Sequence, residues 1–380
     1  CQGQSVPILW PLIFRTGHEI IFAQPSFKWA NLASHNAGVT VSIIGISNHP
    51  SKIRKIISAG DDGASIVKEL AYINAYLIGG ENTIVSKLSA PMSLVSEMKY
   101  GNYPGDGNFL TLNVAEKVEI EQRRPDLRGI VRPVFGAQEF IKGLSRFCLW
   151  IDDEKLSLAL SEPLVSKRID SVRATRLGSR DASLNKLAVR SHQYRDRNVA
   201  SSHLIVVPTI SSEQREYIPA DLKPAEAVTT NQAFALYDAP LWNMALVSSR
   251  LHLVWIATIC GKLEMRYRYS NTLGWNTFPV PLLTEQNKAD LTRCAEDILL
   301  AREAHFPATI ADLYDPETMP DNLRHAHERN DEVLERIYIG RRFKNDTERL
   351  EKLFELYTKM TAADKAKPAA KATRGRKKTV

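Results

Sequence analysis

Basic, acidic and aromatic side chains alternate in the short stretch of residues 261–271. If this stretch forms one extended strand, Glu264, Arg266 and Arg268 lie in a row on one face, because successive side chains point to opposite faces. An arginine can donate two parallel hydrogen bonds to a guanine edge, and a carboxylate can accept one from the amino group of cytosine. The row therefore has the chemistry to read base pairs. A solvated strand face with an internal ion pair is the alternative interpretation.

A second polar segment, residues 190–198, combines side chains that suit phosphates and base edges. Arg190 and Arg195 are able to bind phosphate oxygens, and His192 and Gln193 are able to hydrogen-bond to bases. A solvated connecting loop is the alternative interpretation, because the segment has few apolar residues. Together with the row formed by Glu264, Arg266 and Arg268, the segment suggests one surface that faces DNA.

Signatures of several enzyme classes are absent from the sequence. It contains no GxSxG elbow, no GxxxxGK[ST] phosphate loop and no HExxH helix. The glycine-rich residues 101–107 lack a following amphipathic helix, so we expect a turn there and no cofactor site. We expect His325 and His327 to face solvent on a polar helix, and residues 152–154 to form a charged loop. The sequence therefore predicts neither a metal site nor a catalytic group.

The formal net charge of +7 is unevenly distributed along the chain. From Lys359 onward there are eight basic residues and one acidic residue, so the preceding residues carry 42 of each. Residues 362–380 are rich in Ala, Lys and Pro, and we expect them to form a disordered basic tail. The tail either contacts phosphates without sequence preference or serves as a solubilising terminus.

Composition and cysteine spacing are those of an ordinary cytoplasmic globular protein. The 380 residues, 44% of them hydrophobic, suffice for several domains. Cys1, Cys148, Cys260 and Cys294 lack the paired spacing of a structural zinc site, so we expect reduced thiols. The apolar run at residues 6–14 contains prolines and is too short to cross a bilayer, so we expect no membrane association.

The first elements are two strand-like runs, residues 19–23 and 39–46, and the β-branched residues of the second are typical of a buried strand. We interpret residues 1–60 as the end of an α/β domain. Beyond them, residues 66–77 are expected to be helical. Alternation of helices and strands then predicts an α/β or α+β domain over residues 65–281. Its expected strands are residues 147–151, 204–207 and 263–269.

Helical periodicity marks residues 282–361. Apolar residues recur at helical spacing between residues 291 and 299 and again between residues 350 and 357, where Asn345 followed by Glu348 resembles a capping box. We therefore expect a small helical domain here. The fold class that follows for the whole chain is α/β, mixed with α+β.

Several short motifs, in order along the chain, carry a resemblance to a known family. They are CQGQ at residues 1–4, FKWAN and NAGVTV within 27–41, residues 98–107, RP and GAQEFI within 132–141, and RYS and NTFP within 268–279. With them the chain resembles the MmeI-like family. This family consists of large DNA adenine methyltransferases, many of them fused to a nuclease as type IIL restriction-modification enzymes. The resemblance covers residues 1 to about 350.

The resemblance implies a role for each part of the chain. Residues 1–60 correspond to the last strands of a Rossmann-like methyltransferase sheet, residues 65–281 to the target-recognition domain, and residues 282–361 to a helical C-terminal domain. In this family the strand that matches residues 263–269 contributes base-reading side chains, which assigns that role to Glu264, Arg266 and Arg268.

The resemblance also implies what lies elsewhere. The family's NPP[YF] catalytic loop and its S-adenosylmethionine glycine motif have no counterpart in this sequence. The chain does not begin with Met, so we expect it to be a piece of a longer polypeptide with both motifs before Cys1. We expect this piece to bind no S-adenosylmethionine and to methylate no DNA by itself.

The expected function is DNA recognition within a site-specific, S-adenosylmethionine-dependent adenine-N6 methyltransferase. The expected partners are double-stranded DNA and an upstream methyltransferase domain, with or without a nuclease, of the same polypeptide. The chain would read bases in the major groove and hold the duplex while the target adenine is flipped out. One alternative is a noncatalytic DNA-binding specificity subunit that acts in trans. Another is a small-molecule enzyme with an α/β core, which requires a self-contained pocket.

Overall fold

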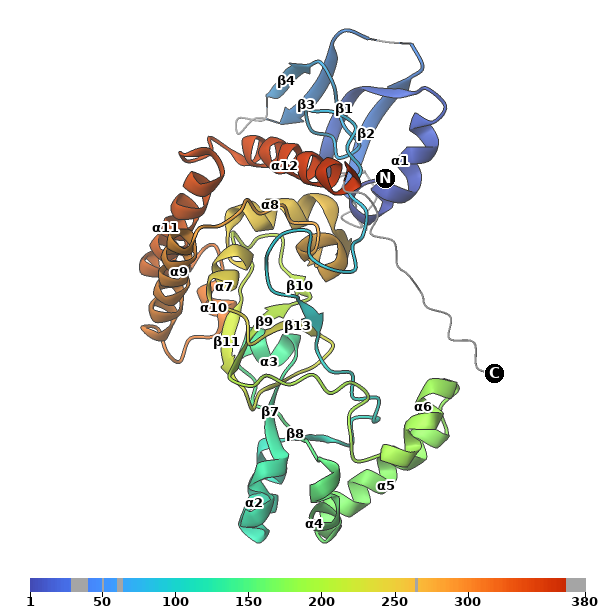
Figure 1. Ribbon diagram of the computed structural model, residues 1–380, viewed down its shortest axis with the longest axis vertical. Helices are drawn as coiled ribbons and strands as arrows, with labels where there is room; N and C mark the ends of the chain where they lie inside the picture. Colours follow the sequence, from blue (N-terminus) through green and yellow to red (C-terminus); the bar gives the residue numbers. More distant parts are fainter. Residues whose placement is uncertain (29–39, 50, 60–63, 264–265, 367–380) are drawn as a thin grey trace, which may run out of the picture.

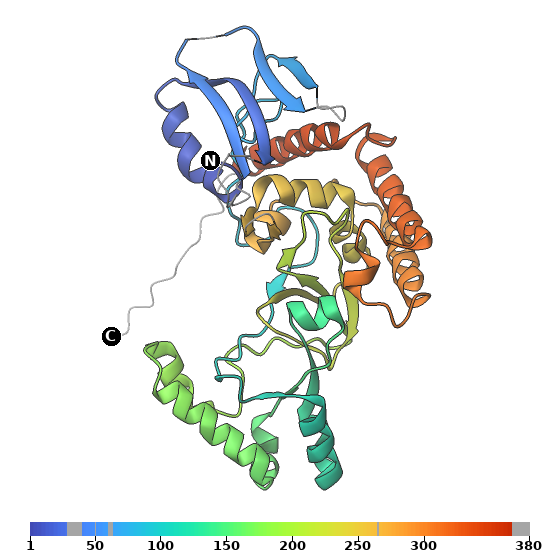
Figure 2. The ribbon, with the colours of Figure 1, turned by 180° about the vertical axis from the view of Figure 1, so that it is seen from behind.

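The computed structural model describes residues 1–366 except for 29–39, 50, 60–63 and 264–265. The molecule is elongated, with a β-sheet at one end and a lobe of short strands and helices at the other (Figure 1). A row of helices lies along one side between these ends, as the view from behind also shows (Figure 2). The fold is mixed α and β, as the sequence predicts.

The first sheet is built by the N-terminal residues. After the short helices η1 (Gly3–Ser5) and α1 (Val6–Phe14), its strands are β1 (Glu19–Lys28), β2 (Thr40–Ser47), β3 (Arg54–Ala59) and β4 (Ser65–Leu70). The strand order is β2-β1-β3-β4, and β1 and β3 run parallel while the outer pairs are antiparallel. The prediction of a helix at residues 66–77 is wrong. The β-branched start of this segment, Ile66 and Val67, pairs with β3 instead, in line with the preference of such residues for strands.

A second sheet lies near the middle of the molecule. It consists of β5 (Lys99–Tyr100), β9 (His203–Pro208), β11 (Asp221–Pro224) and β13 (Ala233–Tyr237), in the order β11-β9-β13-β5. All of its pairs are antiparallel. The strand expected at residues 204–207 forms the buried centre of β9, and its four side chains are fully enclosed.

The lobe at the far end has a sheet and a core of its own. Its strands, in the order β12-β7-β8-β6, are β6 (Thr111–Leu112), β7 (Val131–Phe135), β8 (Phe147–Leu149) and β12 (Val228–Thr229). The core includes Leu112, Val134, Trp150 and Val172. The helices here are α2 (Val114–Arg123), η2 (Pro125–Ile130), η3 (Asp153–Lys155), α4 (Leu156–Leu160), α5 (Pro163–Leu177), α6 (Ala182–Lys186) and η4 (Leu187–Arg190). Helix α3 (Ala137–Lys142) lies beside the middle sheet, where Phe140 packs with Leu204 and Val206 of β9 (Figure 1).

Two elements in the lobe differ from expectation or refine it. The charged loop expected at residues 152–154 contains the one-turn helix η3. The turn expected at residues 101–107 is present, and Gly105 and Gly107 adopt left-handed φ values of 56° and 64°, which other residues rarely adopt.

Helices dominate the last third of the chain. After α7 (Trp242–Val247), α8 (Arg250–Ile259) and the π-helical turn η5 (Asn271–Trp275) come α9 (Glu285–Glu303), α10 (Ile310–Leu313), α11 (Asp321–Ile339) and α12 (Asp346–Ala366). Half of the expected capping box of α12 is present. The Glu348 amide donates to Asn345 Oδ1 at 3.0 Å, whereas the Glu348 carboxylate accepts from the Lys344 amide instead of the Asn345 amide. The helix continues to Ala366, so the first residues of the tail that we expected to be disordered are helical. Alanine and lysine are strong helix formers, which explains this extension.

One large hydrophobic core joins the N-terminal sheet, the middle sheet and the C-terminal helices. It includes Trp10 of α1, Phe234 of β13, Trp255 of α8, Leu291 of α9 and Phe354 of α12. Helix α12 lies between the first sheet and α8 (Figure 1), and the ion pair of Lys68 and Glu351, 3.1 Å long, joins it to β4. The N-terminal sheet, the middle sheet and the C-terminal helices therefore pack as one body.

Candidate nucleic-acid interface

The stretch that suggested base reading forms a hairpin rather than one strand. Strand β14 (Gly261–Leu263) pairs antiparallel with β15 (Arg266–Arg268), and β15 also pairs with β10 (Ile210–Ser211). The single strand expected at residues 263–269 is therefore wrong. Glu264 lies outside the described residues, so its place in the row stays a prediction.

Arg266 and Arg268 lie on one face of a strand, as the sequence predicts. Both are exposed, while Tyr267 between them is partly buried against the main core. Directly paired residues share a face, so Leu263 lies beside Arg266 and Gly261 beside Arg268. The middle strand of this small sheet therefore presents two guanidinium groups on one side, and their paired residues on β14, Leu263 and Gly261, carry no charge.

The base of the hairpin is in contact with the first residues of the chain. Gly3 has a left-handed φ of 58°, and a Cβ atom added there would lie 2.3 Å from the carbonyl oxygen of Cys260. A Cβ atom at Gly261 would lie 3.1 Å from the side chain of Gln4. The backbones approach this closely because both positions are glycine. The turn η1 thus supports the start of β14.

The end of β15 is anchored in the core. The Tyr269 amide donates to the Thr209 carbonyl at 2.9 Å, and the Tyr269 hydroxyl lies 2.8 Å from His252 Nε2. His252 is fully enclosed, and burial lowers its pKa to about 3, so the imidazole is neutral. Tyr269, which belongs to the motif behind the family resemblance, therefore has a structural position beneath the hairpin.

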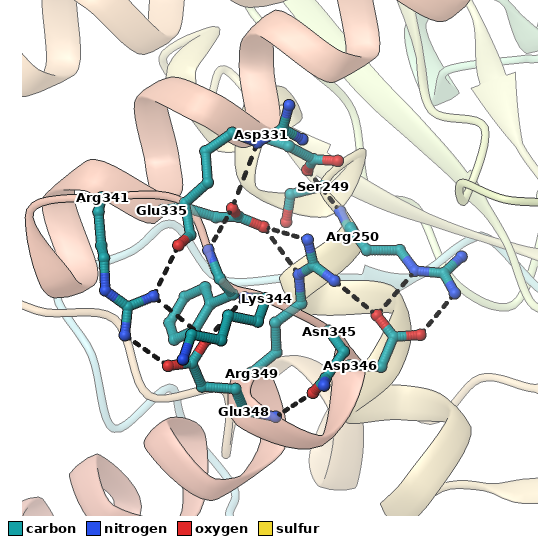
Figure 3. A network of polar contacts seen from close by, with 12 residues as sticks. Ser249, Arg250, Asp331, Glu335, Arg341, Lys344, Asn345, Asp346, Glu348 and Arg349 are labelled. Carbon is teal, nitrogen blue, oxygen red and sulfur yellow. Dashed lines mark hydrogen bonds and ion pairs between the residues drawn. The ribbon is translucent and has the colours of Figure 1, made fainter.

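A buried polar network holds α8, which leads directly into the hairpin (Figure 3). The Arg250 amide donates to Asp331 Oδ1 at 2.7 Å, and the Arg250 guanidinium pairs with Asp346 at 2.6 Å. The Tyr217 hydroxyl donates to the second oxygen of Asp331 at 3.1 Å. Burial raises the pKa of Asp331 to about 7, against the lowering effect of the Arg250 amide. The start of α8 is thereby tied to α11 and α12.

Glu335 is the second buried carboxylate of this network. It is fully enclosed, pairs with Arg349 at 2.6 Å and accepts a hydrogen bond from the Phe343 amide at 2.9 Å. Arg349 also pairs with Asp346 at 2.8 Å (Figure 3). Each carboxylate of the network has a cationic or N–H partner, which is the condition under which buried charge is tolerated. The C-terminal helices therefore fix the direction from which the hairpin emerges.

The second polar segment is mostly engaged in internal contacts. His192 and Gln193 are 5% and 8% exposed. His192 Nε2 lies 2.7 Å and Gln193 Nε2 2.9 Å from the same oxygen of Asp153. Arg190 donates to the Arg195 carbonyl at 2.9 Å. Histidine and glutamine thus hold the segment to η3, and in this conformation they are not at the surface.

Arg195 is the exposed member of this segment. Its guanidinium stacks 4.5 Å from the centre of the Tyr103 ring and pairs with Asp196 at 2.9 Å. Arg197 stacks in the same way on Trp150, at 4.4 Å, and is held by Asp152. The structure thus brings Arg190, His192, Gln193 and Arg195 together. It places Arg266 and Arg268 on a different element, β15, whose neighbour β10 lies near the middle of the molecule (Figure 1).

His327 differs from the expectation that it faces solvent. Its side chain is fully buried, stacks on Tyr217 at 4.2 Å and lies 2.8 Å from the Tyr314 hydroxyl. Burial lowers its pKa to about 3. The helix α11 carries His327 on the face that packs on the core, whereas His325 is exposed.

Three further features concern metal binding, membrane insertion and thiol chemistry. Among the described residues, no group of three or more His, Cys, Asp and Glu side chains is placed to hold a metal ion. Within the same residues no helix is long and apolar enough to cross a membrane. All four cysteines are free, and three of them are buried.

One cavity near the lobe is lined by several charged side chains. It has a volume of about 790 Å³ and lies between the lobe and α9–α10. Four of its charged side chains form two ion pairs, Arg146 with Glu139 and Lys223 with Asp221, both at 2.7 Å.

Comparison with known proteins shows the family to which the chain belongs. Three domain models of one family match consecutive parts of the chain: the MmeI DNA-methyltransferase domain at residues 1–58, the MmeI target recognition domain at 79–282 and the MmeI C-terminal domain at 283–363. The class they define is that of DNA methyltransferases with a dedicated recognition domain. The recognition-domain match alone covers more than half of the sequence. The chain belongs to the MmeI family.

Two relatives illustrate the likeness. DNA methyltransferase A of Bacillus subtilis (strain 168) is 38% identical over 360 residues, which are 95% of this chain and 40% of that protein. The solved structure of the type IIL restriction-modification enzyme MmeI in complex with DNA is 32% identical, with a TM-score of 0.83, over 95% of this chain and 48% of that one. The chain thus spans less than half the length of these two relatives.

Proposed function

We propose that this chain recognises a DNA sequence for a site-specific, S-adenosylmethionine-dependent adenine-N6 methyltransferase of the restriction-modification type. The observation that carries the proposal is the exposed pair Arg266 and Arg268 on the middle strand of the β10–β15–β14 sheet, inside the part that matches a target recognition domain. Two guanidinium groups at this spacing suit direct contact with base edges in the major groove.

The proposed division of roles follows from exposure. Arg266 and Arg268 each contact one guanine edge, and Glu264 accepts from a cytosine amino group on the base pair that Arg266 reads. Arg195 and Arg190 bind phosphate oxygens near the end of the lobe. His192 and Gln193 support this role by holding the segment to Asp153, and they contact bases themselves only if that contact opens.

The rest of the enzyme remains part of the proposal. Residues 1–58 match a methyltransferase domain, which supports a covalently linked methyltransferase with S-adenosylmethionine as its methyl donor. The contribution of this chain is to hold the duplex in register while the adenine leaves the stack, which costs a few kcal/mol. Hydrogen bonds to base edges and phosphates supply the free energy for that step.

The test is the methylated sequence of the complete enzyme that contains this chain. Arg266→Ala is expected to lower affinity for the cognate site by about 1 to 3 kcal/mol and to relax specificity at one base pair. Sequencing that detects methylated adenine reads out the motif directly. Lys262→Ala is the matched control, because Lys262 is an exposed cation of the same hairpin that pairs with Tyr267 and so shares the opposite face. An active Arg266→Ala enzyme with an unchanged motif would refute the base-reading role.

A further inference from the structure

We infer that α5, α6 and the turn between them form a basic arm that lies along the phosphate backbone of duplex DNA beyond the recognised bases. The inference rests on the proposed function, because it assumes that the chain binds duplex DNA. It concerns a different surface, residues 163–190, and a different kind of contact from the base readers on β15.

Charge is segregated in this part of the chain. Residues 163–197 contain nine Lys and Arg and only three Asp, although residues 1–358 as a whole are neutral. Within the arm itself, residues 163–190, four cations are exposed: Lys167, Arg173, Arg180 and Lys186. In the described part of the chain, none of their side chains forms a hydrogen bond or an ion pair, whereas many other surface cations pair with a carboxylate, as Arg123 does with Glu119 at 3.0 Å.

The arm is held rigidly at its inner side. Arg176 of α5 is 1% exposed and donates to the carbonyl oxygens of Pro104, Gly105, Leu187, Arg190 and Gln193 at 2.7 to 3.0 Å. Arg168 donates to Phe109 and Thr111 carbonyls and pairs with Glu116. Asn185 closes the end of α5 by donating to the Arg176 carbonyl at 2.6 Å. Two arginines are therefore used as anchors, and the unpaired cations are left on a fixed support.

The dimensions of the arm suit DNA. Helix α5 has 15 residues, which is about 22 Å of helix and equals the rise of about six or seven base pairs. Both views show α5 and α6 running along the outer side of the lobe, on the side opposite to α9 and α11 (Figures 1 and 2). An exposed helix with unpaired cations suits a polyanion such as duplex DNA. Each Lys or Arg that neutralises a phosphate releases a counterion, and this release favours binding.

The test is the salt dependence of binding to a duplex of arbitrary sequence. The chain is titrated with a fluorescently labelled duplex of about three helical turns at several salt concentrations, and log K is plotted against log[salt]. The triple variant Lys167→Ala, Arg173→Ala and Arg180→Ala is expected to reduce the slope by about 2 to 3, since each phosphate contact contributes about 0.9. All three residues are exposed, so the fold is retained, and thermal unfolding checks this.

Two further variants make the result specific. Lys52, Lys87 and Arg329 are exposed cations outside the arm, and their triple Ala variant is expected to keep the slope of the wild type. The charge-retaining variant Lys167→Arg, Arg173→Lys and Arg180→Lys is also expected to keep it. A wild-type slope in the arm variant, or an equal loss in the outside control, overturns the inference and leaves base reading intact. A wild-type chain that does not bind duplex DNA overturns both proposals.

Discussion

At the scale of single residues, the base of the β14–β15 hairpin depends on two glycines. Gly3 lies in the left-handed region, and its missing side chain leaves room for the Cys260 carbonyl. Gly261, the next residue after Cys260, faces the side chain of Gln4 in the same way. Any side chain at position 3 would push the start of β14 away from the residues that match a methyltransferase domain.

Gly3→Ala is expected to destabilise the chain more than Gly17→Ala does. Both glycines have left-handed φ values, 58° and 78°, so both variants incur a backbone penalty of about 1 to 2 kcal/mol. Gly17 has no atom within 4 Å of an added Cβ, whereas Gly3 adds a clash, which costs a further 1 to 3 kcal/mol or so. Urea unfolding of the two variants measures the difference. Equal losses of stability would contradict the close contact at Gly3.

Prediction from sequence succeeded where the chemistry of a side chain alone decides whether it is exposed or buried. Arg266 and Arg268 are exposed as expected, because a guanidinium is rarely buried without partners. It did not anticipate the burial of His192, Gln193 and His327, whose partners are distant in sequence. Asp153 and Tyr217 lie 39 and 110 residues from His192 and His327, and no local pattern reveals such pairs.

At the scale of elements, a regular alternation of side chains does not distinguish one long strand from two short ones. Residues 261–268 alternate throughout, yet β14 and β15 run antiparallel and β15 is completed by β10 from a distant part of the chain. The helices α9 and α12 were predicted more easily, because apolar spacing and caps are local signals. Strand pairing in the small sheets depends on tertiary contacts, so local sequence signals predict it less well.

The network beneath α8 is expected to make stability depend on pH. Asp331 has a folded pKa of about 7, above its ordinary value of 3.8. A carboxyl whose pKa rises on folding stabilises the fold fully below the unfolded pKa, and this contribution is lost as the pH rises through the folded pKa. Between pH 4 and 7 the wild type should therefore lose at most about 4 kcal/mol from this group.

Asp331→Asn tests this assignment, because the amide has nearly the shape of the protonated carboxyl and does not titrate. The Asn oxygen can still accept from the Arg250 amide, and its nitrogen can donate to the Tyr217 hydroxyl. Denaturant unfolding at pH 5 and pH 8 is expected to show a smaller difference in the variant than in the wild type. An identical pH profile in the two proteins would mean that Asp331 is not the titrating group. Asp315→Asn, a change of an exposed aspartate, controls for the loss of a charge.

At the scale of the whole molecule, the distribution of charge carries more information than its sum. The neutral total up to residue 358 conceals a net excess of five positive charges in the arm, residues 163–190. A count over a moving window would have revealed that excess, but only the structure shows which of these cations are unpaired and which are anchors. The second basic segment, residues 367–380, lies outside the described residues, and its contact with DNA stays a prediction.

Deletion of residues 367–380 is expected to weaken nonspecific DNA binding without altering the recognised sequence. The segment has six basic residues and no acidic one, so its removal should lower the salt slope by at most about 5. Salt titration with an arbitrary duplex measures the slope, and methylation mapping of the complete enzyme measures the motif. Replacing the six basic residues with Gln at full length separates charge from length. A changed motif would show that the segment takes part in sequence recognition.

The arrangement of the two larger cores determines which part of such a protein can be exchanged for that of a relative. The main core draws on Trp10, Trp255 and Phe354, so a chimaera joined near residue 60 or 282 would have to match three partners at once. The lobe around Trp150 and Val172 has a separate core and carries the basic arm. Evolution or engineering can therefore exchange the lobe as a unit, whereas, under the proposed base-reading role, new base preferences would be reached more readily by point substitution at Arg266 and Arg268.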